Sequence, residues 1–185
     1  MTHISRFTDF DIELFQSGKH YRIYEKLGSH LMEANGKQGV YFAVWAPTAK
    51  SVAVMGSFNR WSESSHALKP RWDGSGIWEG FFTEVKKGDI YKYNIVSYDN
   101  KTFAKGDPYA RRWETPPSTA SIVWDTWYEW SDSEWMKDRA AKTGTVQPMS
   151  VYEVHLGSWK KKKEESNRSL TYIELADELV TTSKI

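Results

Sequence analysis

The sequence predicts a mainly β protein whose central part is a small β-sandwich. Short runs rich in Val, Ile and aromatic residues recur between residues 29 and 124, and turn-forming pairs such as Asn-Gly and Asp-Gly separate them. In the fourth run Tyr91, Tyr93 and Ile95 alternate with polar residues, so one face of that strand is apolar and the other is polar. Several such strands within about a hundred residues predict a sandwich.

The elements follow in order along the chain. Residues 5–18 are expected to form a helix, with Thr8 as N-cap and Asp11 three residues later. Residues 21–28 are expected to be extended. Strands are expected at 39–45, 51–56, 76–83, 89–97 and 120–124. Trp45 and Trp78 lie within these strands and are assigned to the core.

The C-terminal third has a different pattern. Residues 125–150 show weak periodicity and several charges, which predicts a linker with one helical turn around Ser133–Arg139. The alternating run at 151–156 predicts a strand, and the stripe between 170 and 180 predicts a helix capped by Ser169 or Thr171. We therefore expect four segments: a helical segment at 1–24, the sandwich at 25–130, a linker at 131–149 and one β/α unit at 150–185.

Composition excludes several kinds of function. The net charge is +1, with 25 basic and 24 acidic residues, so no excess of positive charge favours nucleic acid or an anionic membrane. No run reaches the length of a membrane-spanning helix, the N-terminus has no leader pattern and there is no cysteine, which together predict a cytoplasmic protein. The five histidines, at 3, 20, 30, 66 and 155, do not have the spacing of metal ligands. The sequence also has no phosphate-binding loop that would predict a cofactor. We expect no metal and no cofactor.

The segment GSFNRW, residues 56–61, has the character of a binding site. A strand ends at Gly56, and the turn after it presents Asn59 and Trp61. An indole beside polar groups suits the apolar face of a sugar ring, and Lys92, on the polar face of its strand, could donate to sugar hydroxyls. The alternative interpretation is that Trp61 only caps the edge of the sandwich and that Lys92 is simply solvated.

The chain resembles the glycogen branching enzymes from about Phe7 to Val180. The resemblance rests on segments in the order and spacing of that family. They are HYRIYEKLGSH (20–30), YFAVWAPTAKSVAVMGSFNRW (41–61), GIWEGF (76–81), YKYNI (91–95), DPYA (107–110), PSTASIVW (117–124), SVYEVHLGSW (150–159) and SLTYIELADELV (169–180). WAP with GSFNRW occurs across starch-active relatives, whereas YEVHLGSW after DPYA and TAS is much more specific to branching enzymes.

The resemblance implies that residues 25–130 are a carbohydrate-binding module of family 48, an immunoglobulin-like β-sandwich, and that residues 150–180 are the first strand and helix of a (β/α)₈ barrel. That family cuts an α-1,4-glucan chain and re-attaches it through an α-1,6 link, using one Asp nucleophile and one Glu acid/base. Their motifs do not occur in this chain, so no catalytic residue carries over and we expect the chain alone to be inactive. A complete barrel needs about 250 residues, so the resemblance predicts that this chain is a truncated product. In such a product we expect residues 150–185 to pack on the sandwich, to pair with another copy or to stay mobile.

The resemblance also implies an α-glucan site. Modules of this type use a Trp at the position of Trp61 and a Lys at the position of Lys92, and both match. Their second Trp is not matched, because the turn reads DNKTFAK, with Phe103 as the nearest aromatic residue. Thr119 and Ser121 match the family's polar strand only loosely. The expected glucan contacts are thus Trp61, Lys92, Asn59, Phe103, Thr119 and Ser121.

Two alternatives remain open. A stand-alone glycogen-binding regulatory module would need no residues 150–180, so the predicted β/α unit argues against it. A debranching enzyme or a trehalose-releasing hydrolase of the same clan would share the sandwich but would resemble HLGSW and IYEKLGSH less well. The leading hypothesis is an N-terminal fragment of a branching enzyme that binds α-glucan.

Overall fold

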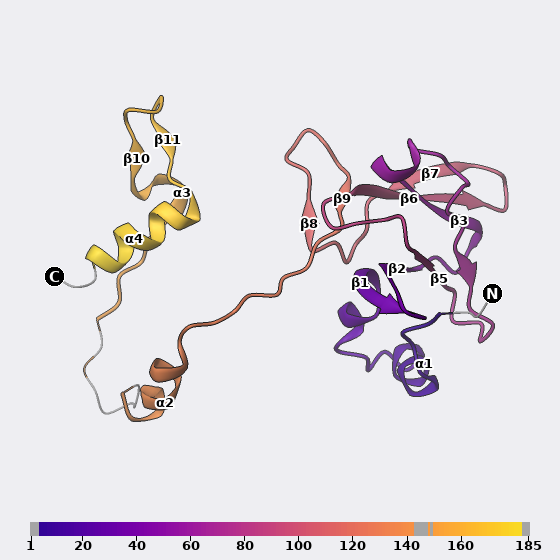
Figure 1. The fold of residues 1–185 in the computed structure, drawn as a ribbon, viewed down its shortest axis with the longest axis horizontal. Coiled ribbons are helices and arrows are strands. Elements are labelled where there is room, and N and C mark those ends of the chain that lie inside the picture. Colours follow the sequence, from indigo (N-terminus) through magenta and orange to yellow (C-terminus); the bar gives the residue numbers. More distant parts are fainter. Residues whose placement is uncertain (1–3, 143–147, 149, 183–185) are drawn as a thin grey trace. The chain divides into compact units, whose positions relative to one another are not determined.

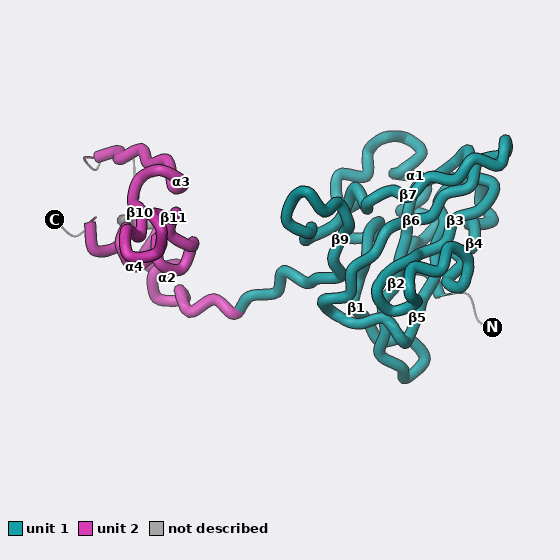
Figure 2. Tube along the Cα trace, turned by 90° about the horizontal axis from the view of Figure 1, so that it is seen from above, with its two compact units in different colours: residues 1–128 teal, residues 129–185 magenta. Residues whose placement is uncertain are grey.

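The structure is a computed structural model, and it describes residues 4–142, 148 and 150–182. The chain divides into two compact units, residues 1–128 and residues 129–185 (Figure 2). The first unit holds the sheets that carry the candidate site. The second is a small assembly of helices and one short hairpin, and each unit is described by itself below.

Two antiparallel sheets form the first unit (Figure 1). One has the order β1-β2-β5-β4, comprising Gly28–Ala34, Lys37–Trp45, Ile77–Phe82 and Lys69–Pro70. The other has the order β3-β6-β9-β8, comprising Ala49–Gly56, Ile90–Ser97, Ser121–Ile122 and Arg112–Trp113, and β7 (Thr102–Lys105) pairs with β6. The predicted mainly β fold class is confirmed, and all five expected strands are present.

Four strands of the first unit were not predicted, and three of them lack a pattern that the sequence alone can show. β4 and β8 have two residues each, which is too short for any alternation. β7 is exposed at every position, so no apolar face marks it. β1 pairs with β2 through a turn in which Asn35 and Gly36 have φ of 53° and 70°. Both values lie in the left-handed region that a two-residue hairpin turn requires and that Asn and Gly tolerate.

The main core lies between the two sheets. Alternate residues of β2, β3 and β6 point inward, as the period of two in a strand requires. They join Trp78, Leu68, Val85 and Val123 in one buried cluster. The inward residues of the three strands are Val40, Phe42, Val44, Val52, Val54, Tyr91 and Tyr93. The predicted burial of Trp78 is confirmed.

The N-terminal segment covers the outer face of the β1-β2-β5-β4 sheet. Helix α1 (Asp9–Gln16) begins with the predicted capping box between Thr8 and Asp11. Its Ile12, together with Phe7, packs on Tyr41, Ala43 and Ile77, which point outward from β2 and β5. Figure 1 shows α1 on the side of β1 and β2 that faces away from β3 and β6. The N-terminal segment therefore covers the part of this outer face around Tyr41, Ala43 and Ile77.

Two expectations about this region were wrong. Residues 21–28 are not extended throughout, because a 3-10 helix, η1, spans Ile23–Glu25 before β1 begins at Gly28. Trp45 is 55% exposed rather than in the core. The physical reason is strand parity: Trp45 shares the outer face with Ala43 and Tyr41, so its ring meets Phe15 of α1 at a centroid distance of 6.0 Å.

The second unit begins with helix α2, Ser133–Lys142, where one helical turn was predicted. The rest of the proposed linker, at 143–147 and 149, lies outside the described residues. Helix α4, Tyr172–Thr182, confirms the predicted C-terminal helix. Thr171 caps it: its hydroxyl and its N–H both donate to Glu174, and the N–H of Glu174 donates back to the Thr171 hydroxyl.

The predicted strand at 151–156 was wrong. Residues 151–155 have no regular structure, and helix α3 spans Leu156–Trp159. A strand forms only where a neighbouring strand takes its N–H and C=O groups. In the described part of the second unit the one pair of strands is β10 (Lys161–Lys162) with β11 (Arg168–Ser169). The described chain therefore provides no strand with which residues 151–156 could pair.

The described residues include no helix long and apolar enough to cross a membrane.

Candidate functional site

The turn after β3 holds the first candidate residues. It comprises the 3-10 helix η2 (Ser57–Asn59) followed by Arg60 and Trp61, whose φ angles are 53° and 60°. The backbone of Gly56 approaches β6 so closely that a Cβ there would lie 2.1 Å from the Ile90 carbonyl oxygen. Only glycine fits at this point. After it, at the end of β3, the chain leaves the sheet and forms the turn.

Asn59 organises this turn. Its Oδ1 accepts a hydrogen bond from the Gly56 N–H at 2.9 Å, and its Nδ2 donates to the Val54 carbonyl at 2.9 Å. The Trp61 N–H also donates to the Gly56 carbonyl at 2.9 Å. Asn59 thus uses its amide to hold the backbone, and Trp61 is the large apolar side chain that the turn presents to solvent, at 43% exposure.

Lys92 and Thr119 meet on the outer face of the β3-β6 sheet. Lys92 lies opposite Met55 in the register and points away from the core that its neighbours Tyr91 and Tyr93 enter. Its Nζ donates a hydrogen bond to Thr119 Oγ1 at 2.8 Å. An ammonium group has three donors, so directing one of them to Thr119 orients the other two.

Asn94 ties the Trp61 loop to that same face. Asn94 follows Lys92 by two residues, so both side chains point outward from β6. Asn94 is buried, and its Nδ2 donates to the Glu63 carbonyl at 2.9 Å. The segment that leads away from Trp61 is therefore fastened over the outer face, on the same side of the sheet as Lys92 and Thr119.

Sequence reasoning did not single out Asn94 as a positioning residue. Its amide nitrogen is used for the Glu63 carbonyl, whereas its Oδ1 is buried with no hydrogen-bond partner among the described residues. The one signal in the sequence was the polar residue on the outward side of a strongly apolar strand. That signal could not show which loop the side chain holds.

The structure separates the remaining candidates from this face. Phe103 pairs with Ile95, so it shares the inward side of β6 and not the side of Lys92. Ser121 is fully buried, and its Oγ accepts a hydrogen bond from the Asp107 N–H at 2.8 Å. Lys92 and Thr119 thus meet on the outer face. Trp61 is exposed on the turn that Asn59 holds, and the segment after that turn is fastened to the same face.

A buried acid lies next to Ser121. The Asp107 carboxyl accepts hydrogen bonds from the hydroxyls of Tyr91 and Tyr93, at 2.6 and 3.1 Å, and from the Tyr109 N–H at 2.8 Å. Burial raises the pKa of Asp107 even though these donors favour its ionised form. The cluster lies inside the sandwich and stabilises the β6–β9 junction beneath the open face.

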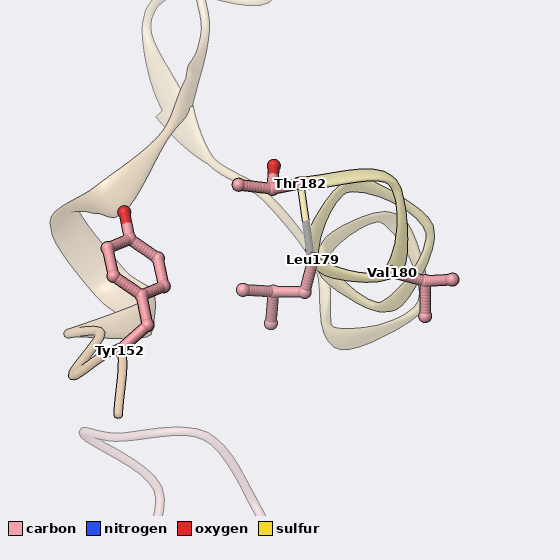
Figure 3. Close-up of a pocket in the computed structure, with 4 residues that line it drawn as sticks. All are labelled: Tyr152, Leu179, Val180 and Thr182. Carbon is pink, nitrogen blue, oxygen red and sulfur yellow. The ribbon is translucent and has the colours of Figure 1, made fainter. Parts of the chain in front are cut away.

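The second unit contains a surface pocket of its own. Tyr152, Leu179, Val180 and Thr182 line it (Figure 3). Figure 3 shows Leu179 and Thr182 directed toward Tyr152, whereas Val180 points away. These side chains carry no charge, and within the described ranges of the whole chain no group of His, Asp and Glu could hold a metal ion. This pocket therefore combines apolar contact from Leu179 and Val180 with the hydroxyls of Tyr152 and Thr182.

The region that carries this face is also matched in comparisons with known proteins. A family model described as carbohydrate-binding module 48 (isoamylase N-terminal domain) matches residues 26–110. Residues 26–110 belong to the carbohydrate-binding module 48 family. The matched range contains both β3 with its Trp61 turn and the Lys92 strand.

The module is part of a longer region of similarity. A 1,4-alpha-glucan branching enzyme GlgB from Aromatoleum aromaticum is 50% identical over 160 residues, which cover 86% of this chain and 24% of that protein. A branching enzyme of the same name from Aquifex aeolicus is 46% identical over 179 residues, covering 97% of this chain and 28% of that protein. The chain is similar to the N-terminal portion of these enzymes and spans about a quarter of their length.

Solved structures were also compared with the module. A Klebsiella pneumoniae pullulanase complexed with maltotriose gives a TM-score of 0.43 at 29% identity, over 54% of this chain and 10% of that one. PulA from Klebsiella oxytoca gives a TM-score of 0.42 at 31% identity, over 56% of this chain and 10% of that one.

Proposed function

We propose that the module binds α-glucan on the outer face of its β3-β6 sheet, through Trp61, Lys92 and Thr119. The observation that carries this proposal is the Lys92–Thr119 hydrogen bond of 2.8 Å on a face whose adjacent loop presents a 43% exposed indole. The opposite sheet has its outer face covered by the N-terminal segment. The family membership of residues 26–110 supports a carbohydrate as the ligand.

The chemistry of these side chains suits a chain of glucose units. The indole of Trp61 offers a flat apolar surface to the C–H face of a sugar ring. Lys92 supplies N–H donors, and the Thr119 hydroxyl can both donate and accept. None of the three groups requires a charged ligand, which fits a neutral polysaccharide. Asn59 acts indirectly in this scheme, because its amide is used to hold the turn.

We further propose that this chain serves as the glucan-holding N-terminal part of a 1,4-α-glucan branching enzyme acting in the cytoplasm. Such an enzyme transfers segments of α-1,4-glucan to α-1,6 branch points. The sequence identity of 46–50% to enzymes of that name supports this role. Binding by the module would keep a glucan chain close to the rest of the enzyme and raise its local concentration there.

The second unit adds a proposal about partners. We propose that residues 150–185 can pair with the same segment of another copy. Helix α4 supports this proposal, because Tyr172 and Ile173 are both 81% exposed and Val180 is 53% exposed. Large apolar side chains gathered on one short helix gain free energy when a second surface removes them from water.

Glucan binding is tested by changing Trp61 to Ala in the whole chain and titrating with maltoheptaose in a calorimeter. We expect the affinity to fall by about 1 kcal/mol or more, which is the scale of an aromatic contact. Trp72→Ala is the matched control, because Trp72 is 72% exposed and follows β4 of the other sheet. A glycogen pull-down gives the same comparison in qualitative form.

Each result of the Trp61→Ala and Trp72→Ala titrations has its own interpretation. Loss of affinity in Trp61→Ala with an unchanged Trp72→Ala supports the proposed face. Equal affinity in Trp61→Ala and the unmodified chain removes Trp61 from the site. Equal losses in both variants would mean that the exposed tryptophans bind sugar without a defined site.

A further inference from the structure

The outer face that carries Lys92 continues across the sheet to the edge strand β8. Ile90 of β6 pairs with Ile122 of β9, and Ile122 pairs in turn with Arg112 of β8. Residues directly opposite each other in antiparallel strands point to the same side of the sheet. Ile90 lies two residues from Lys92, so it shares the outward side of β6. Ile90, Ile122 and Arg112 therefore form a row on the same face as Lys92.

Trp124 lies at the β8 end of this row. Its neighbour Val123 is fully buried in the core, so the Trp124 side chain points to the outer face. The guanidinium carbon of Arg112 lies 4.2 Å from the centroid of the Trp124 ring, and Nζ of Lys87 lies 4.6 Å from that ring. Lys87 Nζ also lies 2.8 Å from Oδ2 of Asp125. Two cations thus lie over one indole, and Lys87 is already paired with a carboxylate.

The guanidinium of Arg112 is oriented, but its hydrogen-bond donors are not used. Its position over the Trp124 indole is a cation–π contact, which restricts the direction of the planar group. The side chain is exposed, and it forms no hydrogen bond or ion pair with the residues that the structure describes. A guanidinium has five N–H donors. Arg112 therefore presents a set of oriented donors to solvent on the face of Lys92.

The surface between Lys92 and Arg112 is apolar. Ile90 and Ile122, which lie between them, are both partly exposed. Neighbouring strands are about 4.8 Å apart, so β6 and β8, with β9 between them, are separated by about 10 Å. A ligand that contacts both cations must therefore extend over several strands. A chain of sugar rings suits this surface, because it offers hydroxyls to the donors at each end and C–H faces to the isoleucines between them.

We propose that Arg112 is a further glucan contact, and that the bound chain runs across the sheet from the Trp61 turn, over Lys92, to β8. This inference rests on the proposed function and extends the same face. The sheet has the strand order β3-β6-β9-β8, so the turn after β3 and Arg112 lie on opposite sides of Lys92. Trp124 is a positioning residue in this scheme, because it holds the guanidinium that contacts the sugar. The site accordingly favours long glucan chains over short ones.

An anion is the other kind of ligand that a guanidinium recognises. The charges near Arg112 do not favour one. Asp125 already pairs with Lys87, and Glu114, two residues after Arg112, adds another carboxylate, which accepts a hydrogen bond from the Ala120 N–H at 3.0 Å. A neutral chain rich in hydroxyls is therefore the ligand that we assign to this end of the face.

The test compares a long and a short glucan on the whole chain. Arg112→Gln removes the charge and the planar fork but keeps a polar side chain. By titration calorimetry we expect its affinity for maltoheptaose to fall by about three- to tenfold, the scale of one hydrogen bond. Its affinity for maltotriose should fall much less, because Trp61 and Lys92 still hold the shorter chain. An unchanged affinity for maltoheptaose, or equal losses for both sugars, would overturn the assignment of Arg112.

Arg139→Gln is the matched control. Arg139 is also an exposed arginine over an indole, with its guanidinium carbon 5.6 Å from the ring centroid of Trp135, but it belongs to α2 of the second unit. This variant should bind both sugars as the unmodified chain does. Equal losses in Arg112→Gln and Arg139→Gln would contradict a defined path to β8. Near-ultraviolet circular dichroism verifies that each variant remains folded.

Nuclear magnetic resonance separates a glucan from an anion at this position. In the unmodified chain, maltoheptaose should shift the indole N–H signal of Trp124, whereas inorganic phosphate at the same ionic strength should not. A shift with phosphate, together with competition between phosphate and maltoheptaose, would assign an anion site and overturn the proposal. Failure of the proposed function is distinguishable, because Trp61→Ala would then leave the affinity for both sugars unchanged. If Arg112 alone is wrongly assigned, Trp61→Ala still loses affinity.

Discussion

Single side chains determine which surface of the module is open to a ligand. The period of two in β6 sends Tyr91 and Tyr93 into the core and Lys92 and Asn94 to the outside. The same rule applied to β2 places Trp45 under the N-terminal helix rather than in the core. A shift of one residue in either strand would exchange the two faces, so the register of β6 decides which of its side chains reach the outer face that we propose for glucan.

A buried ion pair shows how the N-terminal segment is fixed to the sandwich. Glu79 is 1% exposed, and its carboxylate lies 2.9 Å from Nη1 of Arg71. The hydroxyls of Ser5, at 2.9 Å, and Tyr41 also donate to Glu79. Burial, followed by the nearby Glu79 charge, raises the pKa of Tyr41 well above its usual range, so this phenol remains a donor at all ordinary pH values.

Glu79→Ala should therefore lower the free energy of unfolding by about 3 kcal/mol or more, because it leaves the buried Arg71 guanidinium with less charge compensation. The measurement is urea unfolding followed by tryptophan fluorescence. Asp99→Ala is the control, since Asp99 and Lys101 form an ion pair that is exposed on both sides and should change stability little. Similar values for the two variants would show that the Arg71 cluster does not stabilise the fold.

At the scale of elements, the turns and caps were the most predictable features. Thr8 with Asp11, Thr171 before α4, and the turn at Asn35-Gly36 all have the structures that their residue types favour. These features depend on neighbours within a few residues. β4, β7 and β8 were missed because they exist only through their partners, and the strand at 151–156 was wrong because the described chain provides no partner for it.

The α1 capping box should make stability sensitive to acid. Burial opposes ionisation of Asp11, but hydrogen bonds from Lys26, Thr8 and His20 outweigh it and hold the pKa of this carboxyl well below its usual range. A carboxyl with a depressed pKa in the folded state contributes stability above its unfolded pKa of about 3.9, and the contribution is lost as pH falls through lower values.

Asp11→Asn should accordingly flatten the acid side of the stability profile. The free energy of unfolding, measured with urea from neutral pH downward, should fall less steeply below about pH 4 in this variant than in the unmodified chain. Asp9→Asn changes an exposed acid in the same turn and serves as control. If the two variants have the same slope, the Asp11 contacts do not contribute to acid unfolding.

At the scale of the whole molecule, the proposed pairing of residues 150–185 predicts a dependence on concentration. Sedimentation velocity of the unmodified chain should show a larger species as concentration rises. Ile173→Asp should shift the distribution toward monomer, because it places a charge among the exposed apolar side chains of α4. Thr181→Asp adds the same charge at another exposed position of α4 and should have a smaller effect. A single monomeric species at every concentration would contradict this pairing.

Only part of the candidate site could be predicted from the sequence. Trp61 and Lys92 could be named because a Trp after a strand and a Lys on its polar face are local patterns. The exclusion of Ser121 and Phe103 from the open face required the register of β9 and β7 against β6. The contact between Asn59 and His66 and the anchoring of the loop by Asn94 also join residues separated by turns, so periodicity could not reveal them.

The sequence by itself determined the class of fold, most of the strands, the helix caps and the family of residues 26–110, because alternation, capping and turn formation are short-range properties of the chain. Only the tertiary structure decided which face is open and which side chains share it. That choice depends on the pairing between strands and on the N-terminal segment that covers one sheet, and both bring together residues that lie far apart in the sequence.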